Sequence, residues 1–188
     1  MSKGDWQERI GPLVRTQQII VAALIGGCLS FLGVAVVMRL QGAMPQGDPQ
    51  PILSYVLVMF AVTALAARAI VPGVIVARGR RAIARGTWRL PEGPRAGGSL
   101  GDFLAGGGDA AKLAMVSQTS LIVSAALLEG VAFFGLVVYM IQGDLAALAI
   151  AILMILGIAA HFPTRSRVEG WIESQLAALQ QERQLGGR

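Results

Sequence analysis

The chain has 188 residues, of which 54% are hydrophobic and 14% are charged, and its mean hydropathy is +0.62. A water-soluble domain of this size needs more polar surface, so a soluble globular protein is excluded. The net charge is +5, but the basic residues follow the boundaries of four apolar stretches and do not form a nucleic-acid-binding patch. We therefore predict an all-α integral membrane four-helix bundle that binds neither nucleic acid nor nucleotide.

The first membrane span is predicted over residues 16–39. It follows a polar N-terminal segment, residues 1–15, in which Trp6 favours a short interfacial helix over Lys3–Ile10. A span needs about twenty apolar residues in a helix, and this one is too long for the core of a cleaved signal peptide. Small residues at spacings of four let membrane helices approach closely. The small residues for which we expect such packing are Ala22, Gly26 and Gly27 here, and Ala126 and Gly130 in the third span.

The second span is predicted over residues 51–77 and is followed by a cytoplasmic loop, residues 78–118. Arg68 interrupts the span near its inner end, so its long side chain is expected to snorkel to the surface. The start of the loop is expected to be a helical extension near anionic lipid headgroups. Its interfacial residues are Arg78, Arg80, Arg81 and Trp88. A glycine-rich linker follows over residues 91–108, without the Gly-Lys-Ser/Thr sequence of a phosphate-binding loop.

Glu129 lies at the centre of the third predicted span, residues 119–141. An ionisable residue at the centre of a membrane helix costs about 2.5–3.5 kcal/mol on insertion scales, so it must be protonated, paired or bound to an ion. Polar residues at a similar depth are few, and Thr63 and Ser30 are the expected hydrogen-bond partners. Two roles follow as alternatives: a neutral carboxyl that ties helices together, or a site that carries a proton or cation.

The fourth span is predicted over residues 145–162, and a cytoplasmic amphipathic helix over residues 163–188 follows it. After Pro163, a favourable first-turn residue, apolar residues recur at helical spacing and charged residues fill the other faces. We expect this helix to lie at the membrane interface with Trp171 as its anchor. The alternative is that its apolar face docks on a partner or on the central loop.

Lysine and arginine residues are distributed asymmetrically between the segments that join the spans. They occur in residues 1–15, 78–118 and 163–188, whereas the connections 41–50 and 142–144 contain none. By the positive-inside rule, both termini and the long loop are expected in the cytoplasm, with the spans in the inner (plasma) membrane of a bacterium. The four spans then form two hairpins that each run in-out-in.

The two hairpins resemble each other in sequence. Thr, Ile, Ala, Ala, Leu and Gly coincide between Thr16–Gly27 and Thr119–Gly130, and the second helix of each hairpin ends at a proline, Pro72 or Pro163. An internal duplication explains this likeness, and so does the chance similarity of apolar helices. In such a repeat, Gly26 occupies the position of Glu129.

Residues 126–138, ALLEGVAFFGLVV, resemble the carboxylate helix of the proteolipid c subunits of rotary ATPases. In that family an acidic residue is followed by small and aromatic residues and a Gly-Leu-Val-Val run, as Glu129 is here. The resemblance implies that Glu129 carries a proton or a sodium ion and that the protein assembles into a ring. In the family, however, the acid lies on the second helix of a hairpin, whereas Glu129 lies on the first. The overall pattern is also similar to that of small four-helix bacterial membrane proteins.

The sequence does not contain the residue sets of an enzyme. It has one histidine, His161, one cysteine, Cys28, and no nucleophile placed beside a base. An enzymatic activity, a metal site and a cofactor are therefore not expected. We expect an interaction or scaffold component that contacts the lipid bilayer and either a membrane-protein partner or further copies of itself. The alternative is a small proton- or cation-coupled transport component that uses Glu129.

Overall fold

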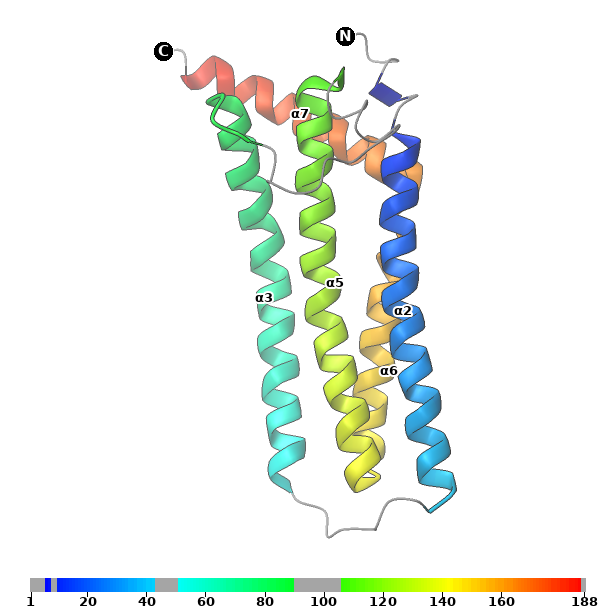
Figure 1. The fold of residues 1–188 in the computed structure, drawn as a ribbon. Coiled ribbons are helices and arrows are strands. Elements are labelled where there is room, and N and C mark those ends of the chain that lie inside the picture. Colours follow the sequence, from blue (N-terminus) through cyan, green and yellow to red (C-terminus); the bar gives the residue numbers. More distant parts are fainter. Residues whose placement is uncertain (1–5, 8–9, 43–50, 90–105, 187–188) are drawn as a thin grey trace. The chain divides into compact units, whose positions relative to one another are not determined.

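The computed structural model describes residues 6–7, 10–42, 51–89 and 106–186, which are helical apart from short turns (Figure 1). The helices are α2 (Gly11–Leu40), α3 (Pro51–Ala84), α5 (Gly108–Gln142), α6 (Leu145–Ala160) and α7 (Arg165–Gly186). No strand occurs in these ranges, so the predicted all-α class is confirmed for them. Most of the expected linker and most of the expected N-terminal interfacial helix lie outside the described residues.

Within the part of the chain that the structure describes, three helices, α2, α3 and α5, are long and apolar enough to cross a membrane. Helix α6 has 16 residues, which at 1.5 Å per residue rise about 24 Å, less than the ~30 Å of a bilayer core. It passes the same test for a membrane span together with α7, across a bend of 71°. The chain thus has the features of a multi-pass membrane protein, with three such helices, or four if the bent pair counts as one span.

The chain divides into two compact units. The apolar unit comprises residues 20–71 and 122–162, and the α7 unit comprises residues 1–19, 72–121 and 163–188. Helices α2, α3 and α5 each have some residues in one unit and some in the other, so each contributes to both units.

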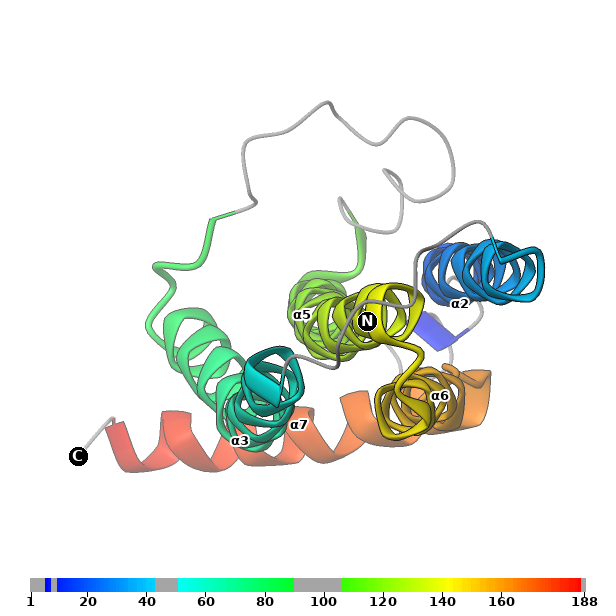
Figure 2. The same ribbon diagram turned by 90° about the horizontal axis from the view of Figure 1, so that it is seen from below.

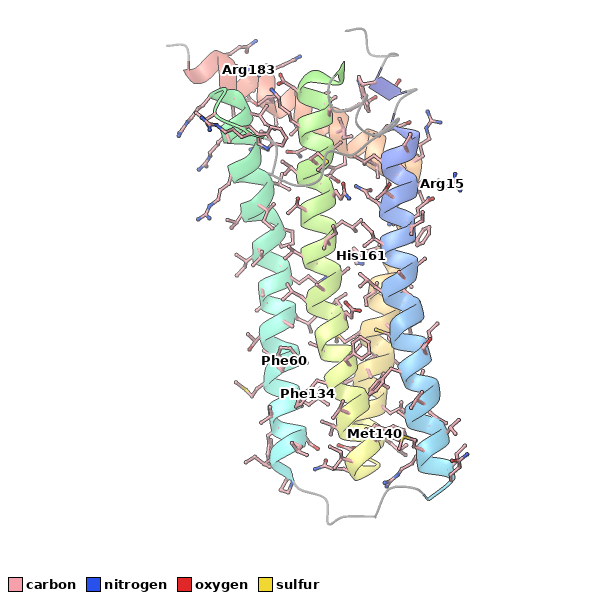
Figure 3. All side chains as sticks on the ribbon, in the orientation of Figure 1. Arg15, Phe60, Phe134, Met140, His161 and Arg183 are labelled. Atoms are coloured by element: carbon pink, nitrogen blue, oxygen red, sulfur yellow. The ribbon has the colours of Figure 1, made fainter. Side chains whose placement is uncertain are left out.

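In the apolar unit, α5 packs against the other three helices (Figure 2). One buried cluster joins α3, α5 and α6, and its members are Leu57, Ala61, Ala64, Val131, Val138 and Ala147. A second cluster joins α2, α5 and α6, and its members are Cys28, Ala132 and Ile155. Two aromatic pairs add to these contacts. Phe31 and Phe133 have ring centroids 5.4 Å apart, and Phe60 and Phe134, which point toward each other in Figure 3, have centroids 6.0 Å apart.

The turn between α5 and α6 is fixed by polar contacts within the apolar unit. Asp144 is the N-cap of α6, where its carboxylate accepts from a backbone N–H at 2.9 Å, and it also accepts from the Ser54 hydroxyl at 2.9 Å. Gly143 has a φ of +70°. The Arg39 guanidinium lies across this glycine and donates to the carbonyl of Gln142. A side chain at position 143 would be strained by the backbone and would collide with the guanidinium, so the turn requires glycine.

In the α7 unit, the apolar face of α7 is buried against other segments of the same chain. Val168 and Ile172 pack in a cluster with the first turns of α2 and α5, and Leu179 packs in a second cluster with α3 and α5. Trp171 and Leu176 contact both clusters. The other buried members are Trp6, Ile10, Leu13, Val14, Ala110, Ala111 and Ala114 in the first cluster, and Ile83, Leu113 and Val116 in the second.

The loop that we expected over residues 78–118 is shorter in the structure. Residues 78–84 continue α3, and residues 108–118 are the first turns of α5. Alanine, lysine, leucine and methionine, which fill residues 110–115, are strong helix formers. Their helical arrangement also buries Ala111, Leu113 and Ala114 almost completely. Residues 78–84 thus form the helical extension that was expected after the second span, whereas the helical turns over residues 108–118 were not predicted because they precede the apolar run; they pack in the α7 unit.

Candidate functional site

Glu129 lies half-buried on α5 in the apolar unit. Within the described ranges its carboxyl group makes no hydrogen bond and no ion pair. The Thr63 hydroxyl instead donates to the carbonyl of Met59 in its own helix at 2.8 Å, and Ser30 is exposed. The thiol of Cys28, on α2, is buried in the cluster with Ala132 and Ile155. The expected hydrogen bond from Glu129 to Thr63 or Ser30 is therefore not formed in this structure.

The small residues expected at helix contacts differ in their surroundings. A Cβ atom at Gly27 would lie 3.9 Å from Cζ of Phe133, and one at Gly130 would lie 3.6 Å from Cζ of Phe60. Both glycines thus face an aromatic ring of a neighbouring helix. Gly130 is half-buried, whereas the other four residues of this set are exposed, namely Ala22, Gly26, Gly27 and Ala126.

Helix α2 buries a different face from the one predicted. Val21, Cys28 and Ala35 are at most 1% exposed and are seven residues apart. A repeat of seven is the spacing of side chains that pack along one seam of a helix pair. The seam contains larger residues than glycine, so a search for small residues at spacings of four does not find it.

Two close helix approaches occur at glycines that were not predicted from the sequence. Gly135 of α5 packs on α6, where an added Cβ would lie 3.0 Å from the Ala147 carbonyl oxygen and 3.2 Å from Cβ of Ala151. Gly79 of α3 faces Val116 of α5, and an added Cβ would come within 2.7 Å of a valine methyl group. Gly135 lies in an apolar run and could have been found, whereas Gly79 stands between two arginines and carries no such signal.

Arg68 of α3 and His161, which follows α6, contact each other in the apolar unit. His161 Nδ1 donates to the carbonyl of Gly157 at 2.8 Å, because a carbonyl can only accept. Nε2 of the neutral ring is then free to accept from the Arg68 guanidinium. Instead of extending alone to the surface, the Arg68 side chain joins α3 to the end of α6.

Charged side chains hold α7 in place within the α7 unit. Arg80 of α3 donates to Glu182 at 2.8 Å and to Gln175 at 2.9 Å, and Arg183 pairs with Asp109 at 2.7 Å. Pairs of this partly exposed kind contribute about 0.2–1 kcal/mol each. The apolar clusters therefore supply most of the stability of this docking, and the charge pairs fix which turn of α7 faces which helix.

The residues that we expected at the membrane interface fall into two groups. Arg78 and Arg81 are exposed on α3. Arg80 is paired with α7, and the rings of Trp88 and Trp171 are partly buried against the second apolar cluster of the α7 unit. Trp171 thus packs on its own chain, which is the docked arrangement that the sequence offered as the alternative for this helix.

Among the described residues, no group of three or more histidine, cysteine, aspartate and glutamate side chains could hold a metal ion. Comparison with family models, with curated proteins and with solved structures finds no match to the chain.

Proposed function

We propose that the protein is a non-enzymatic interaction or scaffold component of the bacterial inner membrane, with both termini in the cytoplasm. The docking of α7 carries this proposal. The helix turns its apolar face to its own chain and is held there by Arg80 and Arg183, so its outer face is fixed. A fixed surface binds a partner without the cost of ordering a loose tail.

The outer face of α7 carries small, uncharged residues over its middle turns. Gly170, Ser174 and Ala177 are exposed and lie on one face at spacings of four and three. Such a face permits close approach by a partner helix. The exposed small residues of α2 offer a second surface of this kind, to a membrane helix of a partner or of another copy. Those residues are Ala22, Gly26 and Ser30.

Site-specific photocrosslinking tests the interaction role. A photoreactive phenylalanine analogue at Ala177, on the outer face of α7, is expected to form a protein adduct in intact cells. The same analogue at Met59, which is 66% exposed on α3, is expected to form adducts with lipid because this part of α3 faces the bilayer. If Ala177 and Ser174 both yield no protein adduct, while the variants are expressed at normal levels, the interaction role is wrong.

The proposed orientation is tested by thiol accessibility in a Cys28→Ala background. Gln41→Cys, just after α2, is expected to react with a membrane-impermeant maleimide added to intact cells. Thr87→Cys, just after α3, is expected to react after the cells are opened, because the basic segments are retained in the cytoplasm. Both residues are exposed, so accessibility within the protein does not limit either reaction. The opposite pattern of labelling would show that the proposed orientation in the membrane is wrong.

A second candidate function is proton- or cation-coupled transport through Glu129. The observation that favours it is the half-buried carboxyl group, which has no hydrogen bond within the described ranges. A carboxyl group in an apolar span that is not tied to a neighbouring helix is free to exchange a proton or to bind a cation. Discrimination between the two functions therefore depends on the behaviour of this one side chain.

A further inference from the structure

Three arginines form an exposed ridge at the end of α3 in the α7 unit. Arg78 and Arg81 lie on the helix, and Arg85 directly follows it with its backbone N–H bonded to the Arg81 carbonyl at 3.1 Å, so spacings of three and four residues place all three on one face. Their guanidinium groups make no hydrogen bond or ion pair with any part of the chain that the structure describes. We call these three residues the arginine ridge.

The rotation of α3 that exposes the ridge is fixed by packing. Gly79 lies directly against Val116 of α5, and Ile83 is 1% exposed in the apolar cluster with α5 and α7. Arg80, on the same inward side, is bound by Glu182 and Gln175. The ridge therefore points away from the acidic residues of α7, and no rotation of α3 could neutralise it without breaking the cluster.

The ridge also continues an apolar exposed face. Val74 lies one turn before Arg78 on the same face and is 40% exposed. One turn of helix rises about 5.4 Å, and an arginine side chain extends far enough to cover that distance. If Val74 contacts lipid chains, the guanidinium groups of the ridge lie at the level of the lipid phosphates.

We propose that the arginine ridge binds the phosphate groups of anionic phospholipids, an inference that rests on the proposed location in a membrane. The guanidinium fork donates paired hydrogen bonds to phosphate oxygens. Negative headgroups attract each basic residue near the surface by an amount equal to about a fivefold change in affinity. A nucleic acid would match the charge as well, but it would leave Val74 in water, so the lipid surface fits the whole face better.

The test uses the full-length protein, purified in detergent and mixed with phosphatidylglycerol or phosphatidylcholine. Retained lipid is counted by native mass spectrometry. The wild-type protein is expected to retain more phosphatidylglycerol than phosphatidylcholine. The triple variant Arg78→Gln, Arg81→Gln, Arg85→Gln is expected to lose the preference, with about fivefold weaker binding for each arginine removed.

Arg80→Gln is the matched control, because it removes one positive charge from the same helix turn on its inward side. It should loosen α7 and keep the lipid preference. The proposal is overturned if the triple variant binds phosphatidylglycerol as wild type does, if Arg80→Gln lowers binding as much as the triple variant, or if an oligonucleotide at equal phosphate concentration displaces the lipid. Reconstitution tests the membrane location separately from lipid binding by the ridge. Failure to enter phosphatidylcholine vesicles at all contradicts the membrane location, whereas entry without any lipid preference contradicts only the ridge.

Discussion

Replacing Trp171 with aspartate is expected to release α7 from the rest of the α7 unit. The indole packs against both apolar clusters, one built on Ile10 and Ile172 and the other on Ile83 and Leu179. Removal of a large aromatic side chain from a packed site costs about 3–5 kcal/mol. A carboxylate placed in the same site adds a desolvation cost. The total free-energy cost is larger than the stabilisation that the ion pairs of Arg80 and Arg183 contribute to the docking of α7.

Limited proteolysis of the detergent-solubilised protein measures this release. Cleavage within residues 165–184 should be slow in wild type and at least tenfold faster in Trp171→Asp, because a difference of 1.4 kcal/mol in local opening is a factor of about ten. Ala177→Asp is the matched control, since it places the same charge on the exposed face of the same helix. Equal cleavage rates in wild type and Trp171→Asp would show that α7 is not docked through this face.

The sequence of α7 predicts the helix and its apolar face, but not what this face packs against. The spacing of Val168, Trp171, Ile172, Leu176 and Leu179 predicted a helix with one apolar face, and the structure contains that helix. The spacing does not predict which surface packs against this apolar face. Lipid and protein both accept leucine and tryptophan, so the interfacial anchor and the docked helix have the same pattern. The covering surface comes from α2, α3 and α5, which lie far away in the chain.

Long apolar runs gave the membrane helices for a simple reason. In a bilayer every backbone polar group must be bonded within the segment, so an apolar run of sufficient length has one stable form. The interhelical contacts are less constrained, because lipid chains and side chains are equally apolar. For this reason, the buried seam of α2 through Val21, Cys28 and Ala35 and the close approach at Gly79 were not predicted. The shortness of α6, with 16 residues, likewise arises from His161 and Pro163, which end the helix before the bend.

Glu129 is expected to be protonated at pH 7 and to react with a carbodiimide that partitions into lipid. The side chain is half-buried in an apolar span and has no ion-pair partner within the described ranges. A carboxylate there would lack both a cation and water, so the neutral form is favoured. Carbodiimide adds to the protonated carboxyl group. Labelling should therefore decline once the pH is high enough for the carboxyl to lose its proton.

Glu129→Gln is the matched control for the labelling, because it keeps the size of the side chain and removes the reactive oxygen. Labelling at position 129 should disappear in this variant, and its thermal stability in detergent should equal that of wild type, because no hydrogen bond to Glu129 is lost within the described chain. The protonated carboxyl is also visible as a C=O band in the infrared spectrum. A carboxylate band at neutral pH in the absence of a bound cation would contradict the neutral assignment.

The Glu129→Gln variant also decides between the two proposed functions, since an amide cannot release a proton. In vesicles that contain wild-type protein, a transport role predicts that an imposed pH or sodium gradient collapses faster than in empty vesicles. Glu129→Gln should abolish this difference while the variant folds and inserts normally. An interaction role predicts equal gradient decay for both proteins, with the Ala177 crosslink to a partner unchanged by the substitution. Because the two readouts concern the apolar unit and the α7 unit separately, one function can fail without affecting the test of the other.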